Sequence, residues 1–135
     1  MRTTLGGLLL LTGLLACGGH DDEGDERMSP GQNCQACHGF AIAGTVYGSA
    51  KADSGAGLGG VTIEVTDANA AVHTLTSNTA GNFMARATLP LPLQKAAVIQ
   101  NGQRVEMSGA PAGDCNRCHT LPPTSGAAGL SLIHI

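Results

Sequence analysis

Two seven-residue stretches carry the chemistry of this 135-residue chain: N-C-Q-A-C-H-G at 33–39 and D-C-N-R-C-H-T at 114–120. Their functional residues are Cys34, Cys37 and His38 in the first motif and Cys115, Cys118 and His119 in the second. Outside the cytoplasm, this spacing is typical of covalent haem attachment. Two thiols add to the two vinyl groups of one haem, and the adjacent imidazole meets the iron from the same side. We therefore expect two covalently attached haem c groups, with His38 and His119 as proximal iron ligands.

Other chemistries use cysteine pairs as well. Four thiolates can hold a structural zinc ion, two local disulfides can form, or one pair can act as a redox dithiol. Zinc does not need a histidine directly after the second cysteine in both copies. A redox dithiol of the thioredoxin type would need a βαβ context, which the sequence does not predict. A haem-free module with zinc or disulfides remains the alternative to the haem hypothesis.

The distal haem ligands are less clearly marked. Met28-Ser29 and Met107-Ser108 each stand shortly before a motif, so Met28 and Met107 are the candidate thioether ligands. Either methionine could instead pack against a porphyrin edge, and His20 and His73 are the candidates if both axial ligands are histidines. An iron without a distal ligand would be open to small molecules. Because the sequence displays no acid–base residues for such a site, we expect an electron carrier and not an enzyme.

Residues 1–17 are typical of a targeting segment. Arg2 precedes an apolar run that is too short for a comfortable membrane span and ends in small residues. The ending L-L-A-C resembles the lipobox of bacterial lipoproteins, which implies cleavage before Cys17 and a lipid on its sulfur. Gly18 stands where an aspartate often signals retention in the inner membrane, so we expect an outer-membrane lipoprotein. Residues 18–27 hold five of the ten acidic residues and predict a solvated tether.

The body of the chain, residues 41–108, has the pattern of a β module between two haem segments at 28–40 and 109–129. Val61, Ile63 and Val65 alternate with polar residues, as in a half-buried strand. Asn101-Gly102 is a strong hairpin signal. The predicted strands cover 41–47, 61–66, 72–76, 83–87, 95–100 and 103–107. Short strands with such turns predict an all-β fold, a small antiparallel β-sandwich.

Three stretches of this module, G-T-V-Y-G, G-V-T-I-E-V-T-D and T-S-N-T-A-G-N-F, resemble the carboxypeptidase regulatory-like (transthyretin-related) β-sandwich. In that family a strand ends in a turn with a glycine followed by an aromatic residue, here Gly81 and Phe83. The resemblance covers roughly 41–107 and implies a binding or spacer module. We expect Glu64, Asp67 and Glu106 to be solvated and His73 to be a surface histidine.

Strand number decides where the two motifs lie. Six strands would return the chain to the end where it entered and bring the motifs close together, whereas seven would separate them. The predicted strands number six, and an error of one would reverse this result.

Charge bears on partners. Without Arg2, six basic and ten acidic residues give a formal charge of −4. Nucleic-acid-binding proteins usually carry a basic surface, so this charge argues against that class. We expect redox proteins of the cell envelope as partners, and the membrane through the lipid anchor.

The last six residues, 130–135, read L-S-L-I-H-I. They match one translation frame of a transposase adaptor used in sequencing libraries. We expect the natural protein to depart from this chain at Leu130, so His134 is not a candidate ligand.

Overall fold

The computed structural model describes residues 29–36, 38–49, 52–53, 55–127 and 129–130. The signal segment, the acidic tether, Met28 and Cys37 lie outside the described residues, as does 131–135 of the expected tail. Within the described residues, no helix has both the length and the apolar character needed to cross a membrane.

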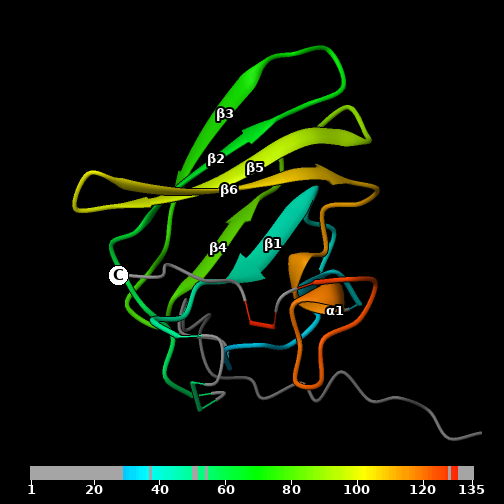
Figure 1. Ribbon diagram of the computed structural model, residues 1–135. Coiled ribbons are helices and arrows are strands. Elements are labelled where there is room, and N and C mark those ends of the chain that lie inside the picture. Colours follow the sequence, from blue (N-terminus) through cyan, green and yellow to red (C-terminus); the bar gives the residue numbers. More distant parts are fainter. Residues whose placement is uncertain (1–28, 37, 50–51, 54, 128, 131–135) are drawn as a thin grey trace, which may run out of the picture.

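Six strands and two single-turn helices make up the described secondary structure (Figure 1). The elements are η1 (Cys34–Ala36), β1 (Ile42–Thr45), β2 (Thr62–Thr66), β3 (Val72–Thr76), β4 (Asn82–Ala85), β5 (Leu93–Gln100), β6 (Gln103–Ala110) and α1 (Cys115–Cys118). The predicted strands correspond one to one with β1–β6. β5 and β6 extend beyond the predicted ranges, and β1 stops short of its predicted end.

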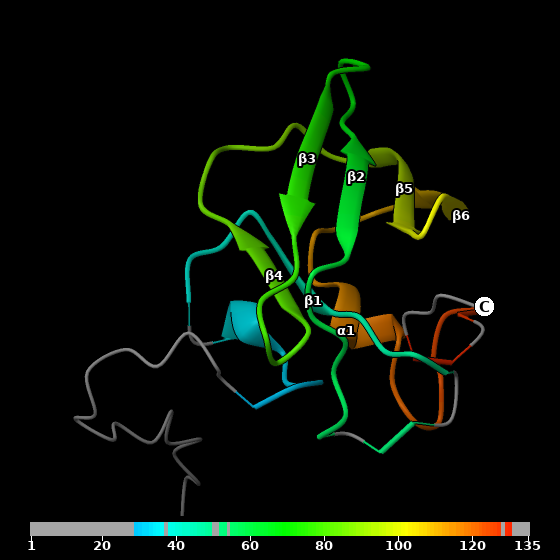
Figure 2. The same ribbon diagram turned by 90° about the vertical axis from the view of Figure 1, so that its left-hand side faces the viewer.

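The strands form two antiparallel sheets. The larger has the order β3-β2-β5-β6, and the smaller pairs β1 with β4 (Figures 1 and 2). The predicted all-β class and antiparallel pairing are confirmed. Asn101 and Gly102 connect β5 to β6 with positive φ angles of 50° and 76°, as a two-residue hairpin turn of the favoured hand requires.

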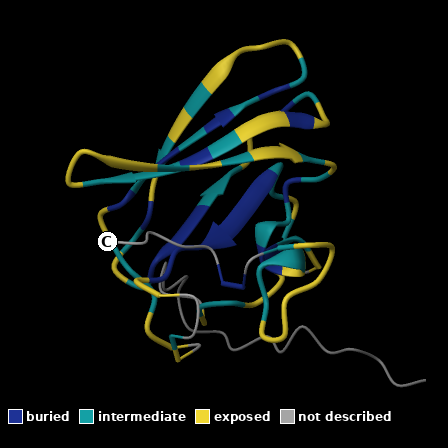
Figure 3. Ribbon diagram, in the orientation of Figure 1, coloured by how far each residue is buried: buried dark blue, intermediate teal, exposed yellow. Residues whose placement is uncertain are grey.

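The core lies between the two sheets. Ile63 and Val65 of β2 and Leu93 of β5 meet Ile42 and Phe83 of the small sheet, and Val46, Val61 and Leu89 complete the cluster. β2 alternates buried and half-buried residues as its sequence predicts. β3 lies at an edge of the large sheet and is more exposed (Figure 3).

β1 differs from the other strands because all four of its residues are buried (Figure 3). Ile42 faces the core, while the segment that leads into α1 covers part of the strand. There Ala43 forms a parallel bridge with Asp114, and the Ala43 N–H donates to the Gly113 carbonyl at 2.9 Å. The segment before α1 therefore pairs with the small sheet through one isolated β-bridge. The same segment leads into the second motif.

The acidic residues of the module do not all follow the expectation. Glu64 and Glu106 are partly exposed and pair with Arg104, and Lys95 also pairs with Glu106. Asp67 was expected to be solvated, which is wrong: it is 2% exposed. Its carboxylate accepts the N–H groups of Asn69 and Ala71 and bonds the His73 ring at 2.8 Å, because the turn after β2 folds the side chain inward.

Candidate functional site

The two cysteine motifs lie side by side at one end of the molecule. η1 and α1 both contact β1, and the Asn116 side chain in α1 donates to the Gln32 carbonyl, two residues before η1. Chain entry and exit thus meet at the same strand, which is the result expected for an even number of strands. The sequence alone did not determine the separation of the motifs, because an error of one in the number of strands would have reversed the result.

Each motif contains one helical turn that begins at its first cysteine, η1 (Cys34–Ala36) and α1 (Cys115–Cys118). The His38 N–H donates to the Cys34 carbonyl at 2.9 Å, and the His119 N–H donates to the Cys115 carbonyl at 3.1 Å. Residues three and four positions apart share one face of a helical turn. The first cysteine and the histidine of each motif are therefore neighbours, and in the second motif Cys118 completes the set. Cys37 lies outside the described residues.

A buried polar cluster joins the two motifs. The Asn116 side chain donates to the Gln32 carbonyl at 2.8 Å and to Thr45 Oγ1 at 3.0 Å, and its Oδ1 accepts the Thr45 N–H at 2.9 Å. Thr45 Oγ1 also accepts the Gly31 N–H at 2.9 Å and donates to Asn82 Oδ1 at 2.7 Å. We call Thr45 and Asn116 the motif lock. It connects the approach to the first motif, the interior of the second motif and both strands of the small sheet.

Two glycines allow the second motif to approach β1 closely. A Cβ at Gly44 would lie 2.5 Å from the Phe83 ring and 2.8 Å from the Cys115 Cβ. A Cβ at Gly113 would overlap the Ala41 carbonyl oxygen. Neither glycine has a positive φ. Close packing and not backbone conformation therefore requires them.

The Cys34 and Cys115 side chains are withdrawn from water, and each sulfur lies beside one backbone carbonyl, that of Gln32 or of Gly113. Cys34 is 6% exposed, and burial raises the pKa of its thiol. Cys115 packs against the hydrophobic core. Burial, together with the charge of Asp114 and smaller contributions from Cys118 and Cys34, raises its pKa to about 12. Both groups are thus thiols at neutral pH, and their environment favours a neutral form of sulfur over a thiolate.

The described cysteines are unpaired, and no metal cluster is seen among them. Cys34, Cys115 and Cys118 are free thiols. Within the described ranges, which omit Cys37, no three His, Cys, Asp or Glu side chains are arranged to hold a metal ion. Cys34 and Cys118 nevertheless lie close enough to Cys115 for their charges to affect its pKa.

The His119 ring is oriented by a backbone carbonyl. Its Nδ1 lies 2.9 Å from the Gly129 oxygen. Because a carbonyl can only accept, Nδ1 carries a proton, so the neutral form of this imidazole has its lone pair on Nε2. Histidines that bind metals commonly hold their second nitrogen in this way. His38 is half-buried, and its ring centroid lies 5.3 Å from that of Phe40.

Met107, the candidate distal ligand on β6, takes no part in the hydrogen bonds described above for the two motifs. Met107 is half-buried and pairs with Ala96, which packs on the core. Its role as a distal ligand stays a prediction. His73 lies on β3, an edge strand of the large sheet, and bonds Asp67 in the turn after β2.

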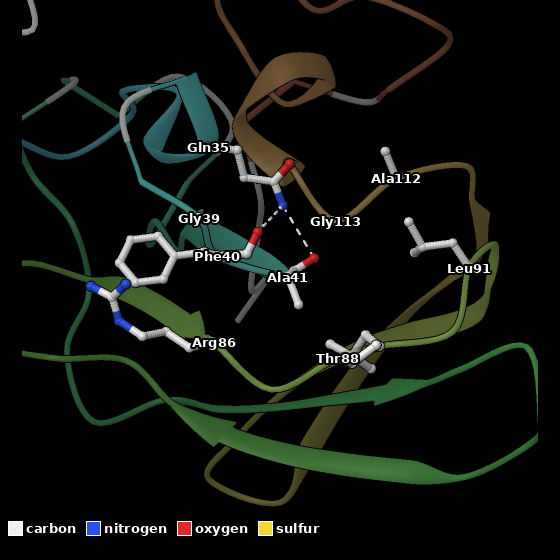
Figure 4. Close-up of a pocket in the computed structure, with 10 residues that line it drawn as sticks. Gln35, Gly39, Phe40, Ala41, Arg86, Thr88, Leu91, Ala112 and Gly113 are labelled. Carbon is white, nitrogen blue, oxygen red and sulfur yellow. Dashed lines mark hydrogen bonds between the residues drawn. The ribbon is translucent and has the colours of Figure 1, made fainter.

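A shallow hollow of about 450 Å³ opens between the flanks of the two motifs (Figure 4). Its lining includes Gln35, Phe40 and Ala41 on the first-motif side and Ala112 and Gly113 on the second-motif side. The Gln35 amide donates to the Phe40 and Ala41 carbonyls at 3.0 and 3.1 Å. These bonds hold the first-motif side of the lining together.

Arg86 borders this hollow. Its guanidinium carbon lies 4.7 Å from the Phe40 ring centroid. Figure 4 shows the two side chains together. Among the described residues, Arg86 forms no ion pair with a carboxylate. The hollow therefore combines a mostly apolar surface with one positive charge at its border.

Sequence reasoning found the motifs but not the residues that hold them together. Thr45 and Asn116 have no special spacing, and Gly44 reads as an ordinary glycine at the start of a strand. The signal available was polarity in an apolar context, since Thr45 lies within the run I-A-G-T-V-Y that the structure buries completely.

Comparison of the chain with protein-family models, with curated proteins and with solved structures gives no significant match. The functional interpretation therefore depends on the two motifs and on the way the fold arranges them.

Proposed function

We propose that this chain is a dihaem c-type cytochrome that carries single electrons between partner proteins. Cys34 and Cys37 would hold one haem covalently, and Cys115 and Cys118 the other. His38 and His119 would be the proximal iron ligands. The observation that carries the proposal is the second motif, where one helical turn combines both cysteines with a histidine whose Nδ1 is fixed by the Gly129 carbonyl.

The surroundings of the cysteines fit a thioether better than a thiolate. A thioether sulfur is neutral and loses nothing by packing against the core, whereas a thiolate at Cys115 would have to be desolvated beside Asp114. The apolar hollow between the motif flanks suits the hydrocarbon edge of a porphyrin. Arg86 at its border suits the carboxylate side chains that haem carries.

A bound haem supplies a reversible one-electron couple; the protein supplies binding, orientation and electrostatics. The helical turns set the relation between cysteines and histidine. The carbonyl of Gly129 selects the His119 tautomer that can donate to a metal. The buried motif lock keeps both segments on one rigid strand. Met28 and Met107 are the proposed distal ligands, and a methionine in that position raises the reduction potential relative to a second histidine.

The β module would act as the spacer that carries the two motifs. We propose that it is of the carboxypeptidase regulatory-like type, on the sequence stretches that resemble that family and on its two antiparallel sheets. We also propose that the chain is anchored in the outer membrane through lipid on Cys17. The acidic tether would then separate the haems from the bilayer, and the partners would be envelope redox proteins.

Intact mass and a pyridine haemochrome spectrum test this function directly, after expression with a c-type maturation system. We expect two haems per chain. Cys34→Ala/Cys37→Ala and Cys115→Ala/Cys118→Ala should each retain one haem, while Cys17→Ser, as the matched control, should keep two and lose the lipid. A wild-type protein without haem would overturn the proposal.

A second candidate is a haem-free envelope module in which the two cysteine pairs bind one zinc ion. The observation in its favour is that Cys34 and Cys118 lie near Cys115. The same preparation distinguishes the two, because one zinc per chain by elemental analysis, with an unmodified polypeptide mass, would establish the module. A polypeptide mass lower by the hydrogens lost in forming two disulfides would instead indicate that the pairs are oxidised.

A further inference from the structure

We propose that Thr45 and Asn116 are positioning residues that hold the two haem-attachment motifs in one fixed relation, so that the two haems act as a coupled pair and not as independent carriers. This inference deepens the proposed function and rests on it. It concerns the relation between the two cofactors, which the motifs themselves do not determine.

The first step is that the motif lock contacts both attachment segments. Asn116 belongs to the second motif, between its two cysteines, and it bonds the Gln32 carbonyl two residues before Cys34. Thr45 accepts the Gly31 N–H from the first segment and the Asn116 amide from the second. The Asn116 side chain therefore links the first attachment segment directly to the second.

The second step is that this arrangement is rigid. Asn116 is 4% exposed and Thr45 is fully buried, and the bonds described satisfy both oxygen and nitrogen of the amide. A fully satisfied buried network specifies one geometry, since any displacement leaves a polar group without a partner. Gly44 and Gly113 add close contacts on the same strand, so the second motif cannot slide along β1.

The third step is that the two anchors are near neighbours. The Asn116 amide nitrogen, between Cys115 and Cys118, lies 2.8 Å from the Gln32 carbonyl oxygen, two residues before Cys34. If each motif held a haem, oxidation of one iron by an external oxidant would add one unit of positive charge near the other. That charge would oppose oxidation of the second iron. The two one-electron steps should therefore be spread further apart than those of the isolated sites.

The first test compares the protein with its parts. Soret circular dichroism and an equilibrium redox titration are recorded for the wild type and for the two single-haem variants, Cys34→Ala/Cys37→Ala and Cys115→Ala/Cys118→Ala. We expect the wild type to show a two-signed Soret signal that is absent from the sum of the variants, and a wider separation of the two redox steps. Two attached haems whose spectra and titrations simply add would overturn this inference while keeping the dihaem function. A protein without haem would fail at the proposed function instead.

The second test changes the lock in a matched pair. Thr45→Val keeps the shape and removes the hydroxyl, whereas Thr45→Ser keeps the hydroxyl. We expect Thr45→Val to lose at least half of the non-additive Soret signal at an unchanged count of two haems, and Thr45→Ser to retain it. Arg117→Gln, at the exposed neighbour of Asn116, should behave as the wild type. Full coupling in Thr45→Val would show that the lock does not position the haems; if that variant does not fold, the comparison of wild type and single-haem variants still decides.

Discussion

At the scale of single residues, Asn116 docks the second motif through three hydrogen bonds. Replacing it by alanine would leave the buried Thr45 N–H without its partner and would remove the amide bonds to the Thr45 hydroxyl and the Gln32 carbonyl. We expect the free energy of unfolding of Asn116→Ala to fall by about 2–4 kcal/mol, since each unsatisfied buried group costs on the order of 1–3 kcal/mol. Urea denaturation measures the loss.

The control for this substitution is the next residue. Arg117 is exposed and belongs to the same helical turn, so Arg117→Ala should stay within about 0.5 kcal/mol of the wild type. Equal losses in the two variants would mean that the helical turn matters in general and that the amide does not.

The Asp67–His73 pair gives the stability a dependence on pH. The hydrogen bond from His73, helped by the N–H groups of Ala71 and Asn69, lowers the pKa of the Asp67 carboxyl. A carboxyl with a lowered pKa in the folded state stabilises fully above its ordinary value of about 3.9 and loses that contribution as the pH falls through the folded-state value. Denaturation midpoints between pH 7 and pH 2 should therefore decrease less steeply in Asp67→Asn than in the wild type. Asp53→Asn, at an exposed position, should keep the wild-type slope; a shared slope in all three proteins would exclude this role for Asp67.

Asp67 also shows where residue-level reasoning from the sequence fails. An aspartate at a turn reads as solvated, and the structure buries it. The available signal was local, because Asp at the start of a turn commonly accepts N–H groups two and four positions ahead. What the sequence could not supply was the partner across the hairpin, His73, whose ring covers the carboxylate.

At the scale of elements, the contact between β1 and the segment before α1 depends on two glycines. Gly113→Ala would place a methyl group on the Ala41 carbonyl, and Gly44→Ala would press one between Phe83 and Cys115. We expect each to cost about 1–3 kcal/mol, as other overpacked sites do, and to loosen the second motif. Thermal unfolding and proteolysis at the C-terminal segment measure the two effects.

Gly48→Ala is the matched control for these glycines. A Cβ there meets nothing within 4 Å, and its φ is not positive. It should leave both stability and proteolysis unchanged. If Gly113→Ala behaved like Gly48→Ala, the packing of the second motif on β1 would not contribute to the fold.

The strands were the part of the fold that the sequence predicted best. Alternation along β2 and the Asn-Gly turn after β5 are local signals, and both are confirmed. The burial of β1 on both faces was not predictable, because it depends on a segment about 70 residues away. The same is true of the motif lock, whose bonds between Thr45 and Asn116 span 71 positions. Patterns of two and four residues cannot report contacts of that range.

At the scale of the whole molecule, the cofactors should contribute to stability. The core is built from a small set of aliphatic residues and one phenylalanine, so a body of this size is marginal without further buried surface. We expect the two-haem protein to unfold at a higher guanidinium concentration than either single-haem variant, and both of these above the protein without haem. The midpoints from far-ultraviolet circular dichroism measure this order. Equal midpoints in all four would mean that the β module folds without help from the motifs.

Gln32 and Asn116 are 84 positions apart, yet they share a hydrogen bond. Contacts of this range form late and slowly. Cys34 is buried and Cys115 packs on the core only once the two segments have met, so both thiols stay accessible until then. A reagent that modifies these cysteines should therefore react faster with the unfolded chain than with the folded one.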